Sequence, residues 1–507
     1  MEIAKQNNDE LTRSLSTDSN APSIETIYSR LQRQGALRGL VRIFVKSYSP
    51  SYQSPWLKGK QRTSMGSGFV LEGLNNHIIT NAHVVRHAIG VRVRINGETK
   101  RWLAKVVSVS FDLDLAVLQP VDTNFWKSVN GSTVLLRKKT PTLGEEVAAL
   151  GYPRGDNASI TKGVVSRCQF DTFLRVQVDA AINAGNSGGP VFDAEGKCVG
   201  VAFAAMNVNH GQNICYIIPV EVLNQFLSQC YDSETKQYTQ FPGKSGMGLE
   251  YQSCENADLR SALGLDKELY NGRGIRVKRV IPFTAATDKL LEDDVILSID
   301  GESIASDGTV KFRENERIPW RYLYRRKNVG ENVSVEILRK NESVFVDMEL
   351  ANIISKCPSD GDPNFNLESW CIIGGAVFLP MTQNLLRSHS KHHPRRVLKP
   401  EEMDFEEDLD EQFVILSHIL AHDINFGYQS WKNYKVEKIN GTKPKNLRHF
   451  AEITLDPKVL TFDILFEHGK RMLLKRESCE KAKDEIIEIH GLKDMLKING
   501  TTNNVEK

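Results

Sequence analysis

The stretch AAINAGNSGGPVF, Ala180–Phe192, places Ser187 between an asparagine and two glycines. Glycine, asparagine and serine also fill sharp turns, so this stretch alone fits either a tight turn or a nucleophile held at a bend. A serine becomes a nucleophile at neutral pH only with a base in hydrogen-bond reach, a carboxylate that orients the base, and N–H donors for the oxyanion. The rest of the sequence therefore decides between the two interpretations.

A candidate base and a candidate carboxylate precede Ser187. His83 lies in TNAHVV, Thr80–Val85, at the end of an apolar run. Asp114 starts a run of strand-forming residues in FDLDLAVLQ. Taken alone, His83 fits a structural histidine and Asp114 a cap or turn residue. Together with Ser187 they stand in the order His, Asp, Ser, which is the order of the chymotrypsin-like double barrel.

The glycines around Ser187 fit the same interpretation. Gly185 and Gly188 can adopt backbone angles that are closed to other residues. The N–H groups of Gly185, Asn186 and Ser187 can then turn toward one point, and we predict that they form the oxyanion hole.

The pattern around these motifs is mainly β. From about Leu40 to Phe203, short β-type runs alternate with glycine, asparagine and aspartate, which indicates an antiparallel barrel or sandwich. Pro219 then opens a predicted helix with an apolar face. Further on, Asp293–Val310 and Lys432–Phe450 share one outline, a strand followed by an Asp-Gly or Asn-Gly turn, which favours a duplicated small α/β module.

Composition excludes several classes of protein. The 507 residues suggest about three domains. The 65 basic and 63 acidic residues leave a net charge of +2, so we expect no nucleic-acid partner, and no apolar run is long enough to span a membrane. The eight cysteines contain no CxxC pair and are interpreted as free thiols of a reducing compartment.

Histidines outside the candidate triad are interpreted as structural. His389, His392 and His393 lie in a charged stretch without the cysteine or carboxylate spacing of a metal site. His418 and His422 have helical spacing but lack the glutamate of a metalloprotease helix. We therefore expect no metal and no cofactor.

Several motifs together resemble the HtrA/Deg serine proteases, in particular the plant-type Deg branch. They are GSGFV (Gly66–Val70), TNAHVV, DLAVLQ, VDAAINAGNSGGPVF, NICYIIP (Asn213–Pro219) and IASDGTVKFRENERIPWRYL (Ile304–Leu323). The resemblance implies a mainly β protein with a chymotrypsin-like double β-barrel followed by two small α/β PDZ-like domains. We expect an N-terminal extension that is disordered or targeting (1–37), a protease domain (38–232), a PDZ domain (243–352), a degenerate PDZ-like domain (365–476) and a C-terminal tail (477–507).

The resemblance assigns a role to each motif residue. His83 is the expected general base, Asp114 its orienting partner and Ser187 the nucleophile of an ATP-independent serine endopeptidase that degrades unfolded or damaged proteins. The loop Gly246, Met247, Gly248 and Leu249 resembles the carboxylate-binding loop of a PDZ domain. Family members form trimers or multiples of trimers.

The chain departs from the family pattern at Ala184, where proline is usual, and at Cys215, where glycine is usual. Phe203, Ala204 and Cys215 are the expected residues of the specificity pocket, and the Cys215 side chain should narrow it. We therefore expect cleavage after small aliphatic residues such as Val or Ala; the alternative is that Cys215 only fills the core.

Two questions stay open from the sequence. The alternative function is a catalytically silent chaperone or peptide-binding scaffold. The resemblance favours a mitochondrial location, with plastid or nucleus as alternatives, although the acidic residues near the N-terminus are atypical of a transit peptide.

Overall fold

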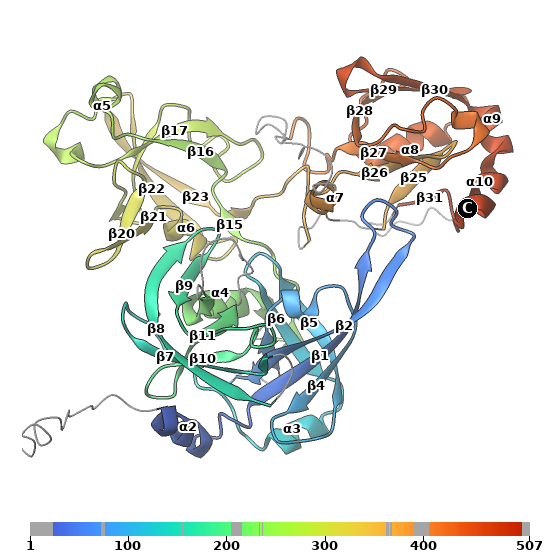
Figure 1. The fold of residues 1–507 in the computed structure, drawn as a ribbon. Helices are drawn as coiled ribbons and strands as arrows, with labels where there is room; N and C mark the ends of the chain where they lie inside the picture. Colours follow the sequence, from blue (N-terminus) through green and yellow to red (C-terminus); the bar gives the residue numbers. More distant parts are fainter. Residues whose placement is uncertain are drawn as a thin grey trace, which may run out of the picture.

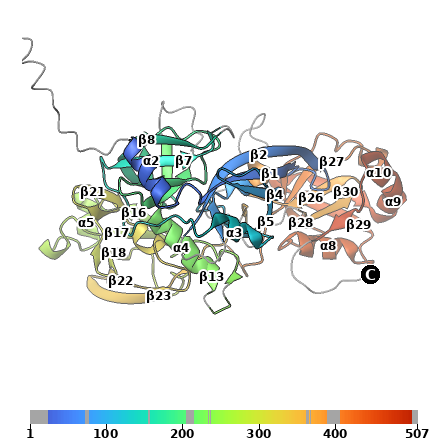
Figure 2. The ribbon, with the colours of Figure 1, turned by 90° about the horizontal axis from the view of Figure 1, so that it is seen from below.

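The computed structural model describes residues 24–71, 77–153, 157–203, 215–232, 234–235, 237–360, 365, 368–388 and 405–498. Figure 1 shows two adjoining barrels, a domain from the middle of the chain next to the second barrel, and a C-terminal domain beyond the first. The view in Figure 2 places these two outer domains at opposite ends of the molecule. The predicted fold class, a mainly β double barrel followed by two small α/β domains, is confirmed.

Strand β1 shows how the first barrel is packed, because its alternate side chains face the core. In β1, Val41, Ile43 and Val45 are buried, while the residues between them are partly exposed. The strands pair in the order β1-β2-β3-β6-β5-β4. Their bounds are β1 Leu40–Pro50, β2 Lys58–Val70, β3 Ile78–Thr80, β4 Ala88–Ile95, β5 Trp102–Ser110 and β6 Leu115–Pro120; η1 (His83–Val85) lies between β3 and β4, and α3 (Asn124–Val129) follows β6.

The second barrel repeats this architecture and carries the predicted helix. Its strands pair in the order β10-β11-β12-β9-β8-β7. They are β7 Glu146–Gly151, β8 Ser159–Phe170, β9 Leu174–Val178, β10 Pro190–Phe192, β11 Cys198–Phe203 and β12 Cys215–Pro219. Helix α4 (Val220–Cys230) starts after Pro219 and buries Leu223, Phe226 and Cys230, which confirms the helix predicted there.

The middle domain is built on one sheet with the order β16-β17-β18-β22-β23, in which β19 also pairs with β18. It contains β15 Ser245–Gly246, β16 Leu249–Ser253, α5 Ala257–Ala262, η3 Glu268–Tyr270, β17 Ile275–Val280, β18 Val295–Ile299, β19 Glu302–Ser303, β20 Thr309–Arg313, β21 Glu316–Pro319, α6 Tyr322–Arg325, β22 Asn332–Arg339, β23 Glu342–Glu349 and β24 Ala351–Asn352. The short pair β13 Tyr231–Asp232 and β14 Gln237–Tyr238 connects it to the barrels.

The C-terminal domain has a seven-stranded sheet with the order β30-β29-β28-β27-β26-β25-β31. Its elements are β25 Trp370–Ile373, β26 Ala376–Pro380, α7 Gln383–Ser388, β27 Val414–Ile419, η5 Asp423–Asn425, β28 Tyr434–Ile439, α8 Leu447–Leu455, β29 Thr461–Phe466, η6 Glu467–Gly469, β30 Arg471–Lys475, α9 Arg476–Lys481, α10 Lys483–His490 and β31 Leu496–Lys497.

The two predicted copies of the small module share one turn geometry. In the first copy, Asp300 and Gly301 have φ values of 49° and 81°; in the second, Asn440 and Gly441 have 47° and 80°. Positive φ at both central residues defines the type I′ turn that connects antiparallel strands. The same turn at matching places of the two sheets supports the predicted duplication.

The ends of the chain differ from the expected extension and tail. In α2 (Ile24–Arg33), Ile27 and Leu31 are fully buried in the core, so this part of residues 1–37 is folded. Within residues 477–507, α10 buries Ile486, and Leu496 and Lys497 of β31 pair with β25. Apolar side chains spaced along an otherwise charged segment hold it to the sheet. The other domain boundaries stay predictions.

The tip of the β1–β2 hairpin reaches the C-terminal domain. The Trp56 ring lies 5.8 Å from the Trp370 ring and 6.2 Å from the His418 ring, measured between centroids. Nearby, Arg86 forms a 3.0 Å ion pair with the buried Asp360. These contacts fix the C-terminal domain to the first barrel.

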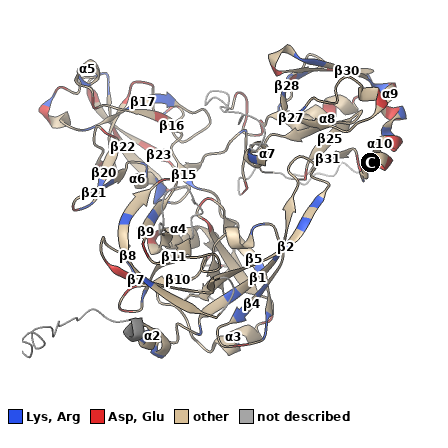
Figure 3. Cartoon of the chain, in the orientation of Figure 1, with Lys and Arg blue, Asp and Glu red and all other residues tan. Residues whose placement is uncertain are grey.

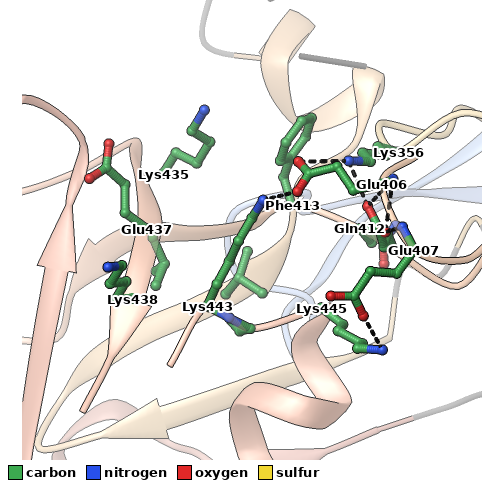
Figure 4. Close-up of a pocket in the computed structure, with 14 residues that line it drawn as sticks. Lys356, Glu406, Glu407, Gln412, Phe413, Lys435, Glu437, Lys438, Lys443 and Lys445 are labelled. Carbon is green, nitrogen blue, oxygen red and sulfur yellow. Dashed lines mark hydrogen bonds and ion pairs between the residues drawn. The ribbon is translucent and has the colours of Figure 1, made fainter. Parts of the chain in front are cut away.

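A hollow of about 350 Å³ opens in the C-terminal domain where β27 and β28 diverge. Figure 4 shows the lysines and glutamates around it, several of them joined in pairs. The buried Lys356 lies 2.6 Å from Glu411, whose carboxylate also accepts the backbone N–H groups of Glu406, Glu407 and Asp408. Burial alone would raise the pKa of Glu411, but these donors outweigh it and lower the pKa to about 2. Glu411 therefore stabilises the folded loop as a carboxylate.

Removal of the Trp56 ring should loosen the C-terminal domain. Because aromatic pairs contribute about 0.5–1.5 kcal/mol each beyond burial, we expect Trp56→Ala to increase the radius of gyration measured by X-ray scattering. Leu57→Ala is the matched control, since Leu57 is the adjacent, exposed residue. Equal radii for wild type and Trp56→Ala would contradict the role assigned to this contact.

The Glu411 cluster should make the C-terminal domain sensitive to acid. The pKa of Glu411 is lower in the folded state, so its contribution is complete above pH 4.5 and is lost as the pH falls toward 2. Urea unfolding should show Glu411→Gln less stable than wild type at pH 7, by up to about 3 kcal/mol, and the difference should shrink at acidic pH. Glu437→Gln, on the same hollow, is the control; a difference independent of pH would exclude this role.

Candidate active site

Strand pairing in the first barrel brings His83 and Asp114 together. Strand β3 ends at Thr80 and pairs with β6, with Thr80 opposite Ala116. His83 follows the end of β3 and Asp114 precedes the start of β6, so the two residues emerge at the same edge of the barrel. Asp114 has a φ of 53°, in the left-handed region that aspartate tolerates, within the turn that leads into β6.

The Asp114 carboxylate binds His83 at two points. Oδ2 accepts a hydrogen bond from His83 Nδ1 at 2.6 Å, and Oδ1 accepts the backbone N–H of His83 at 2.8 Å. A carboxylate can only accept, so Nδ1 carries the proton and Nε2 is left as the basic nitrogen. The Asn81 side chain also donates to the Asp114 carbonyl at 2.9 Å, a contact that the sequence analysis missed.

The loop that carries Ser187 is pressed against the strand that leads to His83. A Cβ atom on Gly188 would lie 2.3 Å from Thr80 Oγ1 and 3.1 Å from the Asn81 nitrogen. Only glycine fits at such a distance, and its φ of 85° also favours glycine. Ser187, one residue earlier, therefore lies at the junction of the two barrels and is 5% exposed.

The Ser187 hydroxyl and the His83 imidazole are not directly bonded. In the described part of the site, no hydrogen bond joins Ser187 Oγ to His83. The imidazole is accessible, with 42% of the side chain exposed. In sites without substrate, such hydrogen bonds are often long and tighten when the substrate binds.

Backbone hydrogen bonds of the Ser187 loop reduce the number of N–H groups that are available for the predicted oxyanion hole. The Asn186 N–H donates to the Asn183 carbonyl at 2.9 Å, so it is already used within the turn. Among the described residues, the N–H groups of Gly185 and Ser187 donate to no protein acceptor. We therefore revise the predicted set of donors to Gly185 and Ser187.

Two of the three residues of the expected specificity pocket can be located. Phe203 ends β11, and its ring lies 6.3 Å from the His83 ring. Cys215 starts β12, and its sulfur accepts the Ile182 N–H at 3.4 Å, so the thiol faces the segment that leads to Ser187. Ala204 lies outside the described residues.

The expected carboxylate-binding loop lies in the middle domain, far along the chain from Ser187. The Met247 and Gly248 carbonyls accept from Ala286 and Ile281 at 2.8 and 2.9 Å. The N–H groups of Met247 and Gly248 have no intramolecular acceptor in the described structure. Leu249 is already paired with Val280 in the sheet.

The described residues contain no group of three or more metal-ligating side chains. His418 lies in β27 and His422 precedes η5, so the two do not share a helix face. His389, His392 and His393 lie outside the described residues. No helix among those described is long and apolar enough to cross a membrane.

Family models match the barrels and the C-terminal domain, and several known proteins are similar to the chain. A trypsin-like peptidase domain model matches residues 66–201, and a PDZ domain model matches residues 360–495. Protease Do-like 2, chloroplastic, of Arabidopsis thaliana is 34% identical over 482 residues, which cover 92% of this chain and 76% of that protein. Protease Do-like 4, mitochondrial, of the same organism is 33% identical over 495 residues, covering 96% and 90%. A solved HtrA-type protease, AlgW with a tripeptide, is 25% identical, covers 64% of this chain and 96% of that chain, and has a TM-score of 0.49.

Proposed function

The chain belongs to the Deg/HtrA family of serine proteases, and on that premise we propose that Ser187, His83 and Asp114 are its nucleophile, general base and orienting carboxylate. The observation that carries this assignment is the 2.6 Å hydrogen bond between His83 Nδ1 and Asp114 Oδ2. It leaves Nε2 free to accept a proton at the edge of the barrel where the Ser187 loop approaches.

The reaction follows from these positions. Ser187 Oγ attacks the carbonyl carbon of the peptide bond and transfers its proton to His83 Nε2. The N–H groups of Gly185 and Ser187 hold the oxyanion. His83 then gives the proton to the leaving amine as the C–N bond breaks, and an acyl-enzyme forms. Water, deprotonated by His83, attacks the ester and releases the carboxylic acid and the Ser187 hydroxyl.

We propose unfolded or damaged proteins as substrates, cleaved without ATP. Hydrolysis of a peptide bond needs no external energy, and an unfolded chain exposes peptide bonds that a folded protein buries. The unengaged N–H groups of Met247 and Gly248, next to the end strand β16, support capture of a chain terminus by the middle domain.

Assembly and location are further proposals from the family. We propose trimers or multiples of trimers, and mitochondria as the location. Several relatives are named mitochondrial and one chloroplastic, which keeps the plastid as the alternative. A fluorescent fusion of the first 60 or so residues distinguishes these compartments. Nuclear fluorescence would favour the nucleus, which is the other alternative.

Digestion of denatured casein tests the catalytic assignment. We expect wild type to degrade casein in the absence of ATP and Ser187→Ala to lose this activity by several orders of magnitude, because the nucleophile is gone. Equal loss of casein in both samples points to contamination. No loss in either sample, together with peptide binding, would instead establish the catalytically silent scaffold.

The Cys215 thiol should limit the size of the residue before the cleaved bond. Mass spectrometry of casein fragments should show wild-type cuts mainly after Val or Ala, and Cys215→Gly should shift them toward larger residues. Cys168→Ala is the control, since the Cys168 thiol, on β8, contacts Arg313 of the middle domain. A majority of wild-type cuts after Phe or Tyr would contradict this pocket.

A further inference from the structure

We propose that Ser67 is a positioning residue that holds the proposed oxyanion donors in place. Ser67 lies in β2 between Gly66 and Gly68, and it is fully buried. The inference rests on the proposed function, since it concerns the loop around Ser187. It adds a residue that touches neither substrate nor the reacting atoms.

Ser67 binds the carbonyl groups of both proposed donor residues. Its Oγ donates to the Gly185 carbonyl at 2.6 Å, and its backbone N–H donates to the Ser187 carbonyl at 2.9 Å. The Gly185 carbonyl belongs to the same peptide group as the Asn186 N–H, which is bonded to Asn183. That peptide group is therefore held at both ends.

The other polar groups of Ser67 bind the rest of the junction. Its carbonyl accepts from Thr80 Oγ1 at 2.8 Å, three residues before His83. Its Oγ accepts the Tyr152 N–H from the second barrel at 3.0 Å. One buried residue thus connects the Ser187 loop, the end of β7 and the strand that leads to His83.

Close packing around Ser67 prevents a neighbouring side chain from replacing its hydroxyl as the donor to the Gly185 carbonyl. A Cβ atom on Gly188 would lie 2.3 Å from the Ser67 carbonyl oxygen, and one on Gly151 would lie 2.9 Å from Ser67 Oγ. There is therefore no room at residue 188 or residue 151 for a side chain that could take the place of the Ser67 hydroxyl. Ser67 is the only described side chain that donates to the Gly185 carbonyl.

The hydroxyl matters because Gly185 is otherwise free to rotate. Gly185 has a φ of 104°, and glycine passes between backbone regions more easily than other residues. Without the Ser67 hydroxyl, the Gly185 carbonyl loses the one side-chain donor that the described residues give it, and the loop can relax. Oxyanion stabilisation depends on donors held in advance at the correct point, so the loss falls on the transition state.

The test compares Ser67→Ala with wild type on a fluorogenic peptide made from a preferred casein site. We expect kcat to fall about 10- to 100-fold, with KM within about twofold of wild type. The inhibition constant of a peptide boronate, which forms a tetrahedral adduct with Ser187 Oγ, should rise by the same factor as kcat falls. A purely structural defect would not produce this parallel change.

Two further variants control for folding. Ser108→Ala removes another fully buried serine hydroxyl of the first barrel and should keep wild-type kcat. Ser67→Cys keeps a side chain of similar size with a weaker donor, and we expect its kcat to lie between wild type and Ser67→Ala.

The outcomes separate the two proposals. An active wild type together with a Ser67→Ala variant that keeps kcat and boronate affinity would overturn the role of Ser67 alone. If Ser67→Ala does not fold, wild-type kcat and boronate affinity in Ser67→Cys overturn that role. A wild type that is no more active than Ser187→Ala would overturn the proposed function and the role of Ser67 with it.

Discussion

The main-chain contact at Gly188 sets the geometry on which the site depends. The second barrel approaches the first so closely that a methyl group at residue 188 would overlap the Ser67 carbonyl and the Thr80 hydroxyl. Residue 188 therefore has no room for a side chain, and the approach of the Gly188 backbone to Ser67 and Thr80 sets the separation of the two barrels. Because Ser187 is covalently joined to Gly188 and His83 lies three residues after Thr80, the positions of hydroxyl and imidazole follow from this one approach.

The domains on either side are attached by apolar packing together with directed hydrogen bonds and ion pairs. In the middle domain, Arg313 donates to the Thr140 and Pro141 carbonyls at 3.1 and 3.0 Å, and the Tyr322 hydroxyl donates to Glu221 in α4 at 2.6 Å. On the other side, Arg86, three residues after His83, pairs with Asp360.

Figure 3 shows acidic and basic residues spread over all domains. A net charge near zero is thus compatible with strong local pairing.

Much of this organisation could be predicted from short sequence patterns. Strand runs, the helix after Pro219 and the Asp-Gly and Asn-Gly turns depend on local conformational preference, so the sequence reveals them. The order His, Asp, Ser indicated the barrel fold.

The contribution of Ser67 could not be predicted, because its hydrogen bonds join residues far apart in the chain; a serine between two glycines in a strand was the available signal. The Asn186 N–H was misassigned because its use within the turn depends on backbone angles that the sequence does not specify. Leu496 and Lys497 were expected in a tail, since too few apolar residues mark that segment.

The exposure of the three proposed catalytic residues matches their different tasks. Asp114 is buried, and a buried carboxylate is costly unless donors surround it, which the two N–H groups of His83 do. Ser187 is buried as well, so its hydroxyl is shielded from bulk water before a substrate arrives. His83 alone is substantially exposed, and it is the residue that must pass a proton first from the hydroxyl to the leaving amine and then from water to the hydroxyl. Because Asp114 accepts hydrogen bonds from both the backbone N–H and Nδ1 of His83, the imidazole keeps its orientation although it is exposed.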